Sequence, residues 1–122
     1  MTTAFHCHEL GVEEAQAELA RFRVIDVRQP EEFRSPEGED QPFSSELGRI
    51  AGSENVPLDR IGAAAVTWDR DTPLLVVCRS GARSGRAAAE LVRLGFRDVT
   101  NLTGGMLAWN ARGLPVARGG AA

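Results

Sequence analysis

The sequence predicts an α/β fold in which helices flank a central parallel sheet. Strand and helix patterns alternate along the chain, as they do in βαβ proteins. Residues 74–77 are the clearest apolar run of a buried strand, and a helical pattern follows them. The 122 residues suit one domain. We expect a single domain over residues 1–116 and a C-terminal tail at 117–122, which we interpret as frayed.

The first half of the chain is predicted to hold short elements. The run 24–27 is apolar apart from one acid, which is typical of a buried strand that ends at Arg28. Pro30 favours the start of a short helix, because proline is well placed in a first helical turn. We expect, in order, a strand at 5–8, a helix from Gly11, a strand at 24–27, a helix at 30–33 and a loop at 34–47.

The second half of the chain contains a clearly amphipathic helix. Ser84, Ala87 and Leu91 recur at helical spacing, while Arg86 and Glu90 fall on the opposite face. We expect a brief strand at 55–57, a small helix at 58–66, a polar connector at 67–73, a strand at 74–77, a helix around 84–92, a strand at 98–102 and a helix at 104–112.

Composition and charge exclude several classes of protein. The formal net charge of −3 argues against a general nucleic-acid or membrane-surface binder. No apolar stretch approaches the roughly 20 residues of a membrane helix, and residues 1–12 lack a secretory pattern. Cys7 and Cys78 are too few for a disulfide framework. We therefore expect a cytoplasmic protein with free thiols and no nucleic-acid or membrane partner.

The loop after the 74–77 strand carries the strongest chemical signal. Cys78 ends that strand, at the edge of a parallel sheet where ligands gather. The small residues behind it let backbone N–H groups point inward as an anion nest, and arginines and a helix start favour the nucleophilic thiolate. The predicted binding loop consists of Arg79, Ser80, Gly81, Ala82, Arg83 and Ser84. The alternative is a buried core cysteine, which needs no flanking arginines.

At this point the sequence resembles the rhodanese family of sulfurtransferases. The resemblance rests on "VIDVRQPEEF" at 24–33, "LGRIAGSENVP" at 47–57, "CRSGARS" at 78–84 and "NLTGGMLAWNARGLPV" at 101–116. Four motifs in the family's order cover nearly the whole chain. The resemblance implies a rhodanese-like α/β fold with a central parallel sheet, and a persulfide on Cys78 as the catalytic residue.

The predicted chemistry is sulfur transfer in two halves, a ping-pong scheme with a covalent intermediate. Cys78 takes sulfur from a small-molecule donor such as thiosulfate, and cyanide or a thiol removes it. We expect Arg83 to fix the conformation and the charge of the loop, and we expect Arg79 to attract the anionic donor. Asp26 and Arg28 either brace the loop from below, face the pocket, or form a structural salt bridge, which we favour. No cofactor and no metal are expected.

Two other functions use the same residues. A cysteine phosphatase or arsenate reductase also sets cysteine and arginine in an oxyanion cradle, but typically with five residues between them. Cys78 and Arg83 enclose four. A sulfur-relay or binding module for a partner enzyme, which would exchange sulfur with a relay protein, is the other alternative.

Four further features of the sequence bear on function. Arg49 stands where the family often has histidine, and segment 34–47 is longer than the usual connection, so both bear on acceptor choice and pocket access. The alternative for the segment, which we favour, is a solvated loop with no role. Trp109 either lines the pocket rim or packs in the core. The "HCH" at residues 6–8 offers too few ligands for zinc, which wants three or four.

Overall fold

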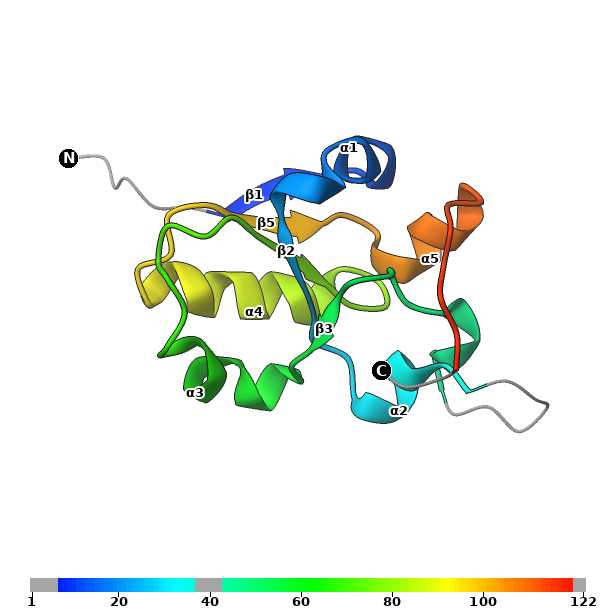
Figure 1. Ribbon diagram of the computed structural model, residues 1–122, viewed down its shortest axis with the longest axis horizontal. Helices are drawn as coiled ribbons and strands as arrows, with labels where there is room; N and C mark the ends of the chain where they lie inside the picture. Colours follow the sequence, from blue (N-terminus) through cyan, green and yellow to red (C-terminus); the bar gives the residue numbers. More distant parts are fainter. Residues whose placement is uncertain (1–6, 37–42, 120–122) are drawn as a thin grey trace.

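The central sheet is parallel throughout, as predicted. The computed structural model describes residues 7–36 and 43–119, and within them five strands form one sheet in the order β1-β5-β4-β2-β3 (Figure 1). All of the strand pairs are parallel. The strands are β1 (Cys7–Leu10), β2 (Arg23–Asp26), β3 (Glu54–Asn55), β4 (Leu74–Val77) and β5 (Val99–Leu102).

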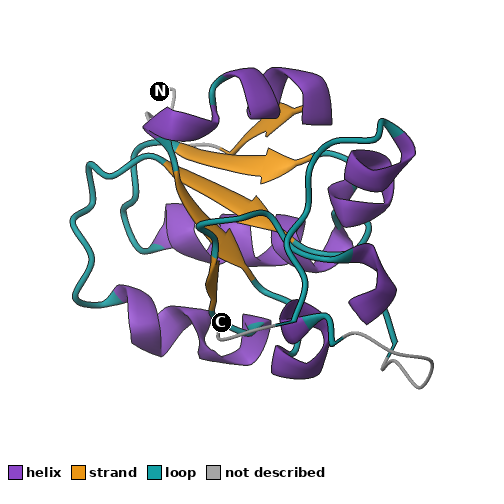
Figure 2. Ribbon diagram, turned by 45° about the vertical axis from the view of Figure 1, so that its right-hand side comes forward, coloured by secondary structure: helices purple, strands orange, loops and turns teal. Residues whose placement is uncertain are grey.

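Helices cover both faces of this sheet, as Figures 1 and 2 show. Alternate residues of β4 face opposite sides, so Leu74 and Val76 pack with α3 and α4, while Leu75 and Val77 pack with α1 and α5. The helices are α1 (Val12–Ala17), α2 (Pro30–Arg34), α3 (Ile61–Ala65), α4 (Ala82–Arg93) and α5 (Gly105–Ala111), with 3-10 turns η1 (Leu19–Arg21), η2 (Ser45–Leu47) and η3 (Leu58–Arg60).

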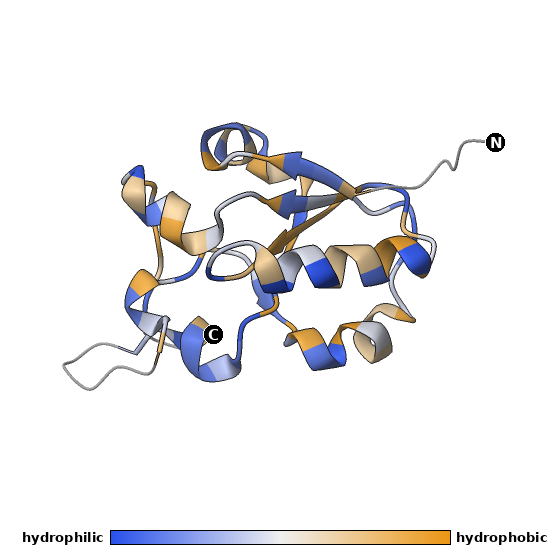
Figure 3. Ribbon diagram, turned by 180° about the vertical axis from the view of Figure 1, so that it is seen from behind, coloured by the Kyte–Doolittle hydropathy of each residue, from blue (hydrophilic) through white to orange (hydrophobic). Residues whose placement is uncertain are grey.

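Helix α4 is amphipathic in the way its sequence predicts. Ser84, Ala87 and Leu91 are buried against the sheet, and Arg86 is exposed. Figure 3 shows hydrophilic and hydrophobic bands alternating along this helix. None of the helices in the described part of the chain is long and apolar enough to cross a membrane.

The strand register brings three carboxyl ends to one edge of the sheet. Asp26 at the end of β2 lies beside Val77 at the end of β4, and Asn101 on β5 lies beside Val76. Cys78 follows β4 directly, so it emerges among these strand ends. This edge is where an open parallel sheet normally binds its ligand.

Several element boundaries differ from the sequence prediction. Strand β1 runs to Leu10 rather than ending at residue 8, and residues 5 and 6 lie outside the described residues. The expected helix at 58–66 is divided into η3 and α3. Helix α4 begins at Ala82, two residues earlier than its apolar pattern, because the left-handed Gly81 turns the loop sharply into it.

The end of the described chain is held against the body rather than frayed. Ala117 pairs with Arg49 in an isolated antiparallel bridge, and the N–H of Gly119 donates to the carbonyls of Arg34 and Ser35. The side chain of Arg49 closes the contact by donating to the Gly119 carbonyl at 2.8 Å. The expected tail is therefore anchored as far as Gly119, and residues 120–122 lie outside the described residues.

Candidate active site

Cys78 is buried at the end of β4 with its sulfur enclosed by hydrogen-bond donors. Only 1% of the residue is exposed. Its Sγ accepts hydrogen bonds from the backbone N–H of Gly81 at 3.1 Å and of Ser84 at 3.3 Å. The Ser84 hydroxyl lies 3.3 Å from the same sulfur. The loop therefore curls around Cys78 with donors pointing at its sulfur, an arrangement that favours negative charge there.

Gly81 gives the loop this shape. Its φ of +103° is a left-handed conformation that costs glycine little and other residues much. It is also the N-cap of α4, so the N–H groups of the helix's first turn, which have no partner inside the helix, open next to Cys78. Ser80 and Ala82 on either side of Gly81 are exposed, whereas Cys78 and Ser84 are buried.

A chain of polar side chains reaches the sulfur from β5 and β1. The Ser84 hydroxyl has one proton and two acceptors within reach, Asn101 Oδ1 at 2.5 Å and Cys78 Sγ at 3.3 Å. The Asn101 amide nitrogen donates to Glu9 and to the Gly81 carbonyl, each at 3.2 Å, and this fixes its oxygen toward Ser84. The hydroxyl can therefore turn to the sulfur when the sulfur carries charge.

Arg83 is tied to helix α2 by a bidentate ion pair. Its two terminal nitrogens donate to the carboxylate of Glu32 at 2.8 and 3.0 Å. The hydrogen bond to Glu32 raises the pKa of Arg83. Burial acts to raise the pKa of Glu32, but the Arg83 hydrogen bonds and the Gln29 backbone N–H outweigh it and hold that pKa below its ordinary value. Both groups therefore stay charged, and the pair links the start of α4 to α2.

Arg79 is a cation without an ionic partner among the described residues. Its Nε is buried and has no hydrogen-bond partner within them. The guanidinium carbon lies 4.8 Å from the ring centroid of Phe43, which stacks on it. The backbone of Arg79 is anchored on the other side, because its carbonyl accepts the N–H of Leu107 at 3.0 Å.

Helix α5 supports the loop through its amino-terminal end. Met106 donates its N–H to the Cys78 carbonyl at 2.9 Å, next to the Leu107 contact with Arg79. Gly105 allows this approach, because a Cβ at that position would lie 2.5 Å from both carbonyl oxygens. The backbone of Cys78 and Arg79 is therefore fixed by α5.

Asp26 and Arg28 form a fully enclosed structural pair, the alternative that the sequence analysis favours. Both residues are 0% exposed, and two nitrogens of Arg28 contact the carboxylate of Asp26 at 3.0 Å. Burial raises the pKa of the Asp26 carboxyl, and the Arg28 hydrogen bonds oppose that rise. The remaining N–H groups of Arg28 donate to the carbonyls of Ser44 and Gly48 at 3.1 and 2.8 Å. The pair thus fixes segment 44–48.

The structure shows the contacts of two of the open residues. Arg49 is 9% exposed and donates to the carbonyls of Phe33, Arg34 and Gly119, so it anchors backbone. Trp109 is 1% exposed and packs in the core, with its Nε1 donating to the Pro115 carbonyl at 2.9 Å.

The second cysteine lies at the other end of the sheet. Cys7 is level with Val99, which is level with Leu74 at the start of β4, whereas Cys78 follows the end of β4. Burial raises the pKa of the Cys7 thiol, and the charge of Glu9 adds to the rise. His8 is exposed on the same strand, and His6 lies outside the described residues.

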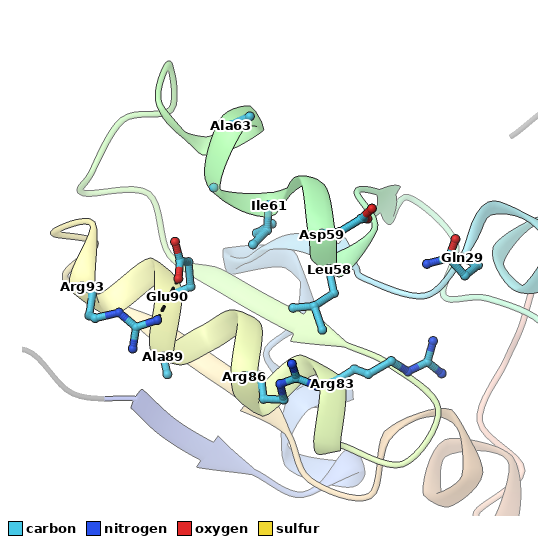
Figure 4. A pocket seen from close by; sticks show the side chains of 11 residues that line it. Gln29, Leu58, Asp59, Ile61, Ala63, Arg83, Arg86, Ala89, Glu90 and Arg93 are labelled. Carbon is cyan, nitrogen blue, oxygen red and sulfur yellow. Dashed lines mark hydrogen bonds and ion pairs between the residues drawn. The ribbon is translucent and has the colours of Figure 1, made fainter.

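A groove of about 830 Å³ runs between α4 and the η3–α3 segment (Figure 4). Arg83 and Gln29 lie at one end of it, and Arg93 and Glu90 at the other. Cys78 is not part of its walls. The groove therefore borders the cysteine loop through Arg83 but is separate from the sulfur.

Sequence reasoning misses five residues of this site. Glu32 lies in a quoted motif without a role, and its place three residues after Gln29 is a capping signal. The pair Gly104–Gly105 is a signal for close backbone approach. Glu9 and Asn101 have no local signal, because 92 residues separate them and only strand pairing brings them together.

Comparison with known proteins identifies the family to which the chain is similar. Residues 11–112 match the family described as a rhodanese-like domain. The chain is 33% identical over 109 residues to thiosulfate sulfurtransferase 16, chloroplastic, of Arabidopsis thaliana, covering 80% of this chain and 81% of that protein. It is 33% identical over 89 residues to thiosulfate sulfurtransferase GlpE of Pseudomonas aeruginosa, covering 73% and 70%.

A solved structure extends the likeness to the fold. The crystal structure of a rhodanese-related protein from Thermoplasma volcanium superposes with a TM-score of 0.72 at 27% identity, covering 90% of this chain and 97% of that one. The family match, the relatives and the fold agree with the motifs found around Cys78. The chain belongs to the rhodanese-like domain family.

Proposed function

We propose that this protein is a thiosulfate-type sulfurtransferase that carries sulfane sulfur as a persulfide on Cys78. Family membership and relatives named thiosulfate sulfurtransferases support a sulfurtransferase-type function. The observation that carries the finer proposal is the enclosure of Cys78 Sγ by the N–H of Gly81 and by the N–H and hydroxyl of Ser84. Such donors stabilise an anionic sulfur.

The donor half of the reaction loads the cysteine. The Cys78 thiolate attacks the outer sulfur of thiosulfate and forms a new S–S bond, while the bond between that sulfur and the sulfonate breaks. Sulfite leaves with the electron pair, and the terminal sulfur on Cys78 keeps one negative charge. Arg79, a cation next to Cys78 without an ionic partner among the described residues, attracts the anionic donor.

The acceptor half of the reaction removes the sulfur from Cys78. Cyanide or a thiolate attacks the terminal sulfur, its new bond to sulfur forms, and the S–S bond breaks to return the Cys78 thiolate. Between the halves, the N–H groups of the first turn of α4, from Ala82 onward, lie where they can donate to the terminal sulfur. No proton has to be moved in either step, so no general base is required.

The two alternatives use the same loop differently. A phosphatase needs a cradle for a tetrahedral anion, and a ring closed by Arg83 after four residues is narrow for it. Arg83 also has both terminal nitrogens engaged by Glu32, which leaves it little capacity to hold a phosphate. A sulfur-relay module would load Cys78 from a partner protein instead of from thiosulfate.

Steady-state assays separate these functions. We expect thiocyanate to form from thiosulfate and cyanide, and no hydrolysis of an aryl phosphate by the same preparation. Cys78→Ser is expected to abolish thiocyanate formation, whereas Cys7→Ser serves as the matched control and retains it. Phosphate hydrolysis without thiocyanate would overturn the proposal. Sulfur loading from a protein persulfide but not from thiosulfate would favour the relay.

A further inference from the structure

Two exposed hydrophobic residues, Phe43 and Leu107, contact Arg79 in the cysteine loop. Phe43 is 69% exposed and Leu107 is 39% exposed, and in the described part of the chain Val66 is the other large apolar residue that is exposed. Phe43 stacks on the guanidinium of Arg79. Leu107 donates its backbone N–H to the Arg79 carbonyl. Phe43 therefore contacts the side chain of Arg79, the residue that follows Cys78, and Leu107 contacts the Arg79 backbone.

Buried hydrogen bonds to the neighbouring residue Ser44 fix the position of Phe43. Ser44, the next residue, is 1% exposed, and its carbonyl accepts a hydrogen bond from the buried Arg28 at 3.1 Å. The Ser44 hydroxyl also lies 3.4 Å from Arg28. Because Arg28 is itself held by Asp26, the buried pair fixes the backbone that presents Phe43 to Arg79.

The charge of Arg79 has no ionic partner within residues 7–36 and 43–119. Arg83 is paired with Glu32 and Arg28 with Asp26, whereas Arg79 has no ion pair with any residue in the described ranges. Its buried Nε has no acceptor there either. A buried donor without a partner costs free energy, so an acceptor atom supplied by a ligand would be bound favourably.

We propose that Arg79, Phe43 and Leu107 form an acceptor rim that selects aliphatic thiols carrying an anionic group. The guanidinium binds the anion, and the two apolar side chains cover the aliphatic chain. This inference rests on the proposed sulfurtransferase function and names the acceptor class for it. The acceptor thiolate attacks the terminal sulfur of the Cys78 persulfide, leaves as an alkyl persulfide anion and returns the Cys78 thiolate.

The test measures the acceptor half-reaction alone. Protein loaded with thiosulfate and freed of excess donor is mixed with mercaptoalkanoates of increasing chain length, or with mercaptoalcohols of matching length. Sulfur removal is followed by intact-mass spectrometry, and second-order rate constants are expressed per thiolate. In wild type the constants are expected to rise with chain length, by at most about four-fold for each fully buried methylene. Carboxylates are expected to exceed their matched alcohols.

Two variants of Phe43 and one control variant make the test specific to the rim. Phe43→Ala is expected to flatten the dependence on chain length, and Phe43→Leu to restore part of it. Val66→Ala is the matched control, because Val66 is 62% exposed but lies in the connection to the start of β4, away from Cys78. It is expected to keep the wild-type dependence.

The outcomes separate this inference from the function on which it rests. Equal chain-length dependence in wild type and Phe43→Ala would overturn the apolar part of the rim. Equal rates for carboxylates and alcohols would overturn the role of Arg79. Either result leaves sulfur on Cys78 and the proposed function intact. Failure of Cys78 to take sulfur from thiosulfate at all would instead contradict the function itself.

Discussion

Replacing Gly105 with alanine is expected to displace the backbone of the cysteine loop relative to α5. Gly105 adopts φ +57°, and a Cβ there would lie 2.5 Å from the carbonyl oxygens of Cys78 and Arg79. Ordinary van der Waals contact begins at 3.4 Å, so the two carbonyls must move by about 0.9 Å relative to α5. Those carbonyls accept the N–H groups of Met106 and Leu107, and both hydrogen bonds are at risk.

The expected magnitudes follow from these distances. Alanine in a left-handed conformation costs roughly 1–2 kcal/mol, and each hydrogen bond contributes about 1 kcal/mol. We expect Gly105→Ala to lower the free energy of unfolding by about 3 kcal/mol. A displacement near 1 Å at a reacting group can cost about 100-fold in rate, so kcat/KM for thiosulfate-to-cyanide transfer is expected to fall by roughly that factor.

Gly113→Ala is the matched control for backbone strain. Gly113 has φ +69°, and a Cβ there would meet nothing within 4 Å. It is expected to lose about 1 kcal/mol of stability and to keep its activity. Urea unfolding and thiocyanate formation are measured for both variants under conditions where each is folded. Wild-type kcat/KM in Gly105→Ala, or an equal loss in Gly113→Ala, would refute the idea that α5 positions the loop.

Three further predictions concern residues around the loop. Glu32→Gln is expected to lower stability at pH 7; because the pKa of Glu32 is lowered in the folded protein, the gap to wild type should close as pH falls below the ordinary value of 4.5. A gap in urea unfolding that stays constant in acid would contradict this. Ser84→Ala is expected to slow thiocyanate formation on the order of 100-fold, as removal of one donor does; an unchanged rate would restrict the hydroxyl to Asn101. Arg49→Ala is expected to increase hydrogen exchange at residues 117–119 while thiosulfate still loads Cys78, and unchanged exchange there would refute its anchoring role.

The fold was predictable because its signals are local. The run 74–77 is apolar at every position, and the structure buries all four residues on both faces of the sheet. The helical spacing of Ser84, Ala87 and Leu91 is also a local signal, and it predicted α4. The division between η3 and α3 was not predicted, because the alanines of α3 favour a helix but do not mark the residue at which the 3-10 turn ends.

Only the part of the site formed by one contiguous segment was predictable. Cys78 and its loop are contiguous, so the cradle could be inferred from glycine and helix-start signals. The ion pair of Arg83 with Glu32 joins residues 51 positions apart, and the stacking of Arg79 on Phe43 joins two loops. Such pairs depend on how the whole chain folds, and local patterns in the sequence do not reveal them.

The central claim is that Cys78 carries the transferred sulfur, and intact-mass spectrometry tests it most directly. Thiosulfate-treated wild type is expected to gain the mass of one sulfur atom and to lose it again on addition of cyanide. Cys7→Ser is expected to behave in the same way, because Cys7 lies at the opposite end of the sheet. Cys78→Ser is expected to gain nothing. A sulfur adduct that forms in Cys78→Ser and disappears with cyanide would contradict the assignment.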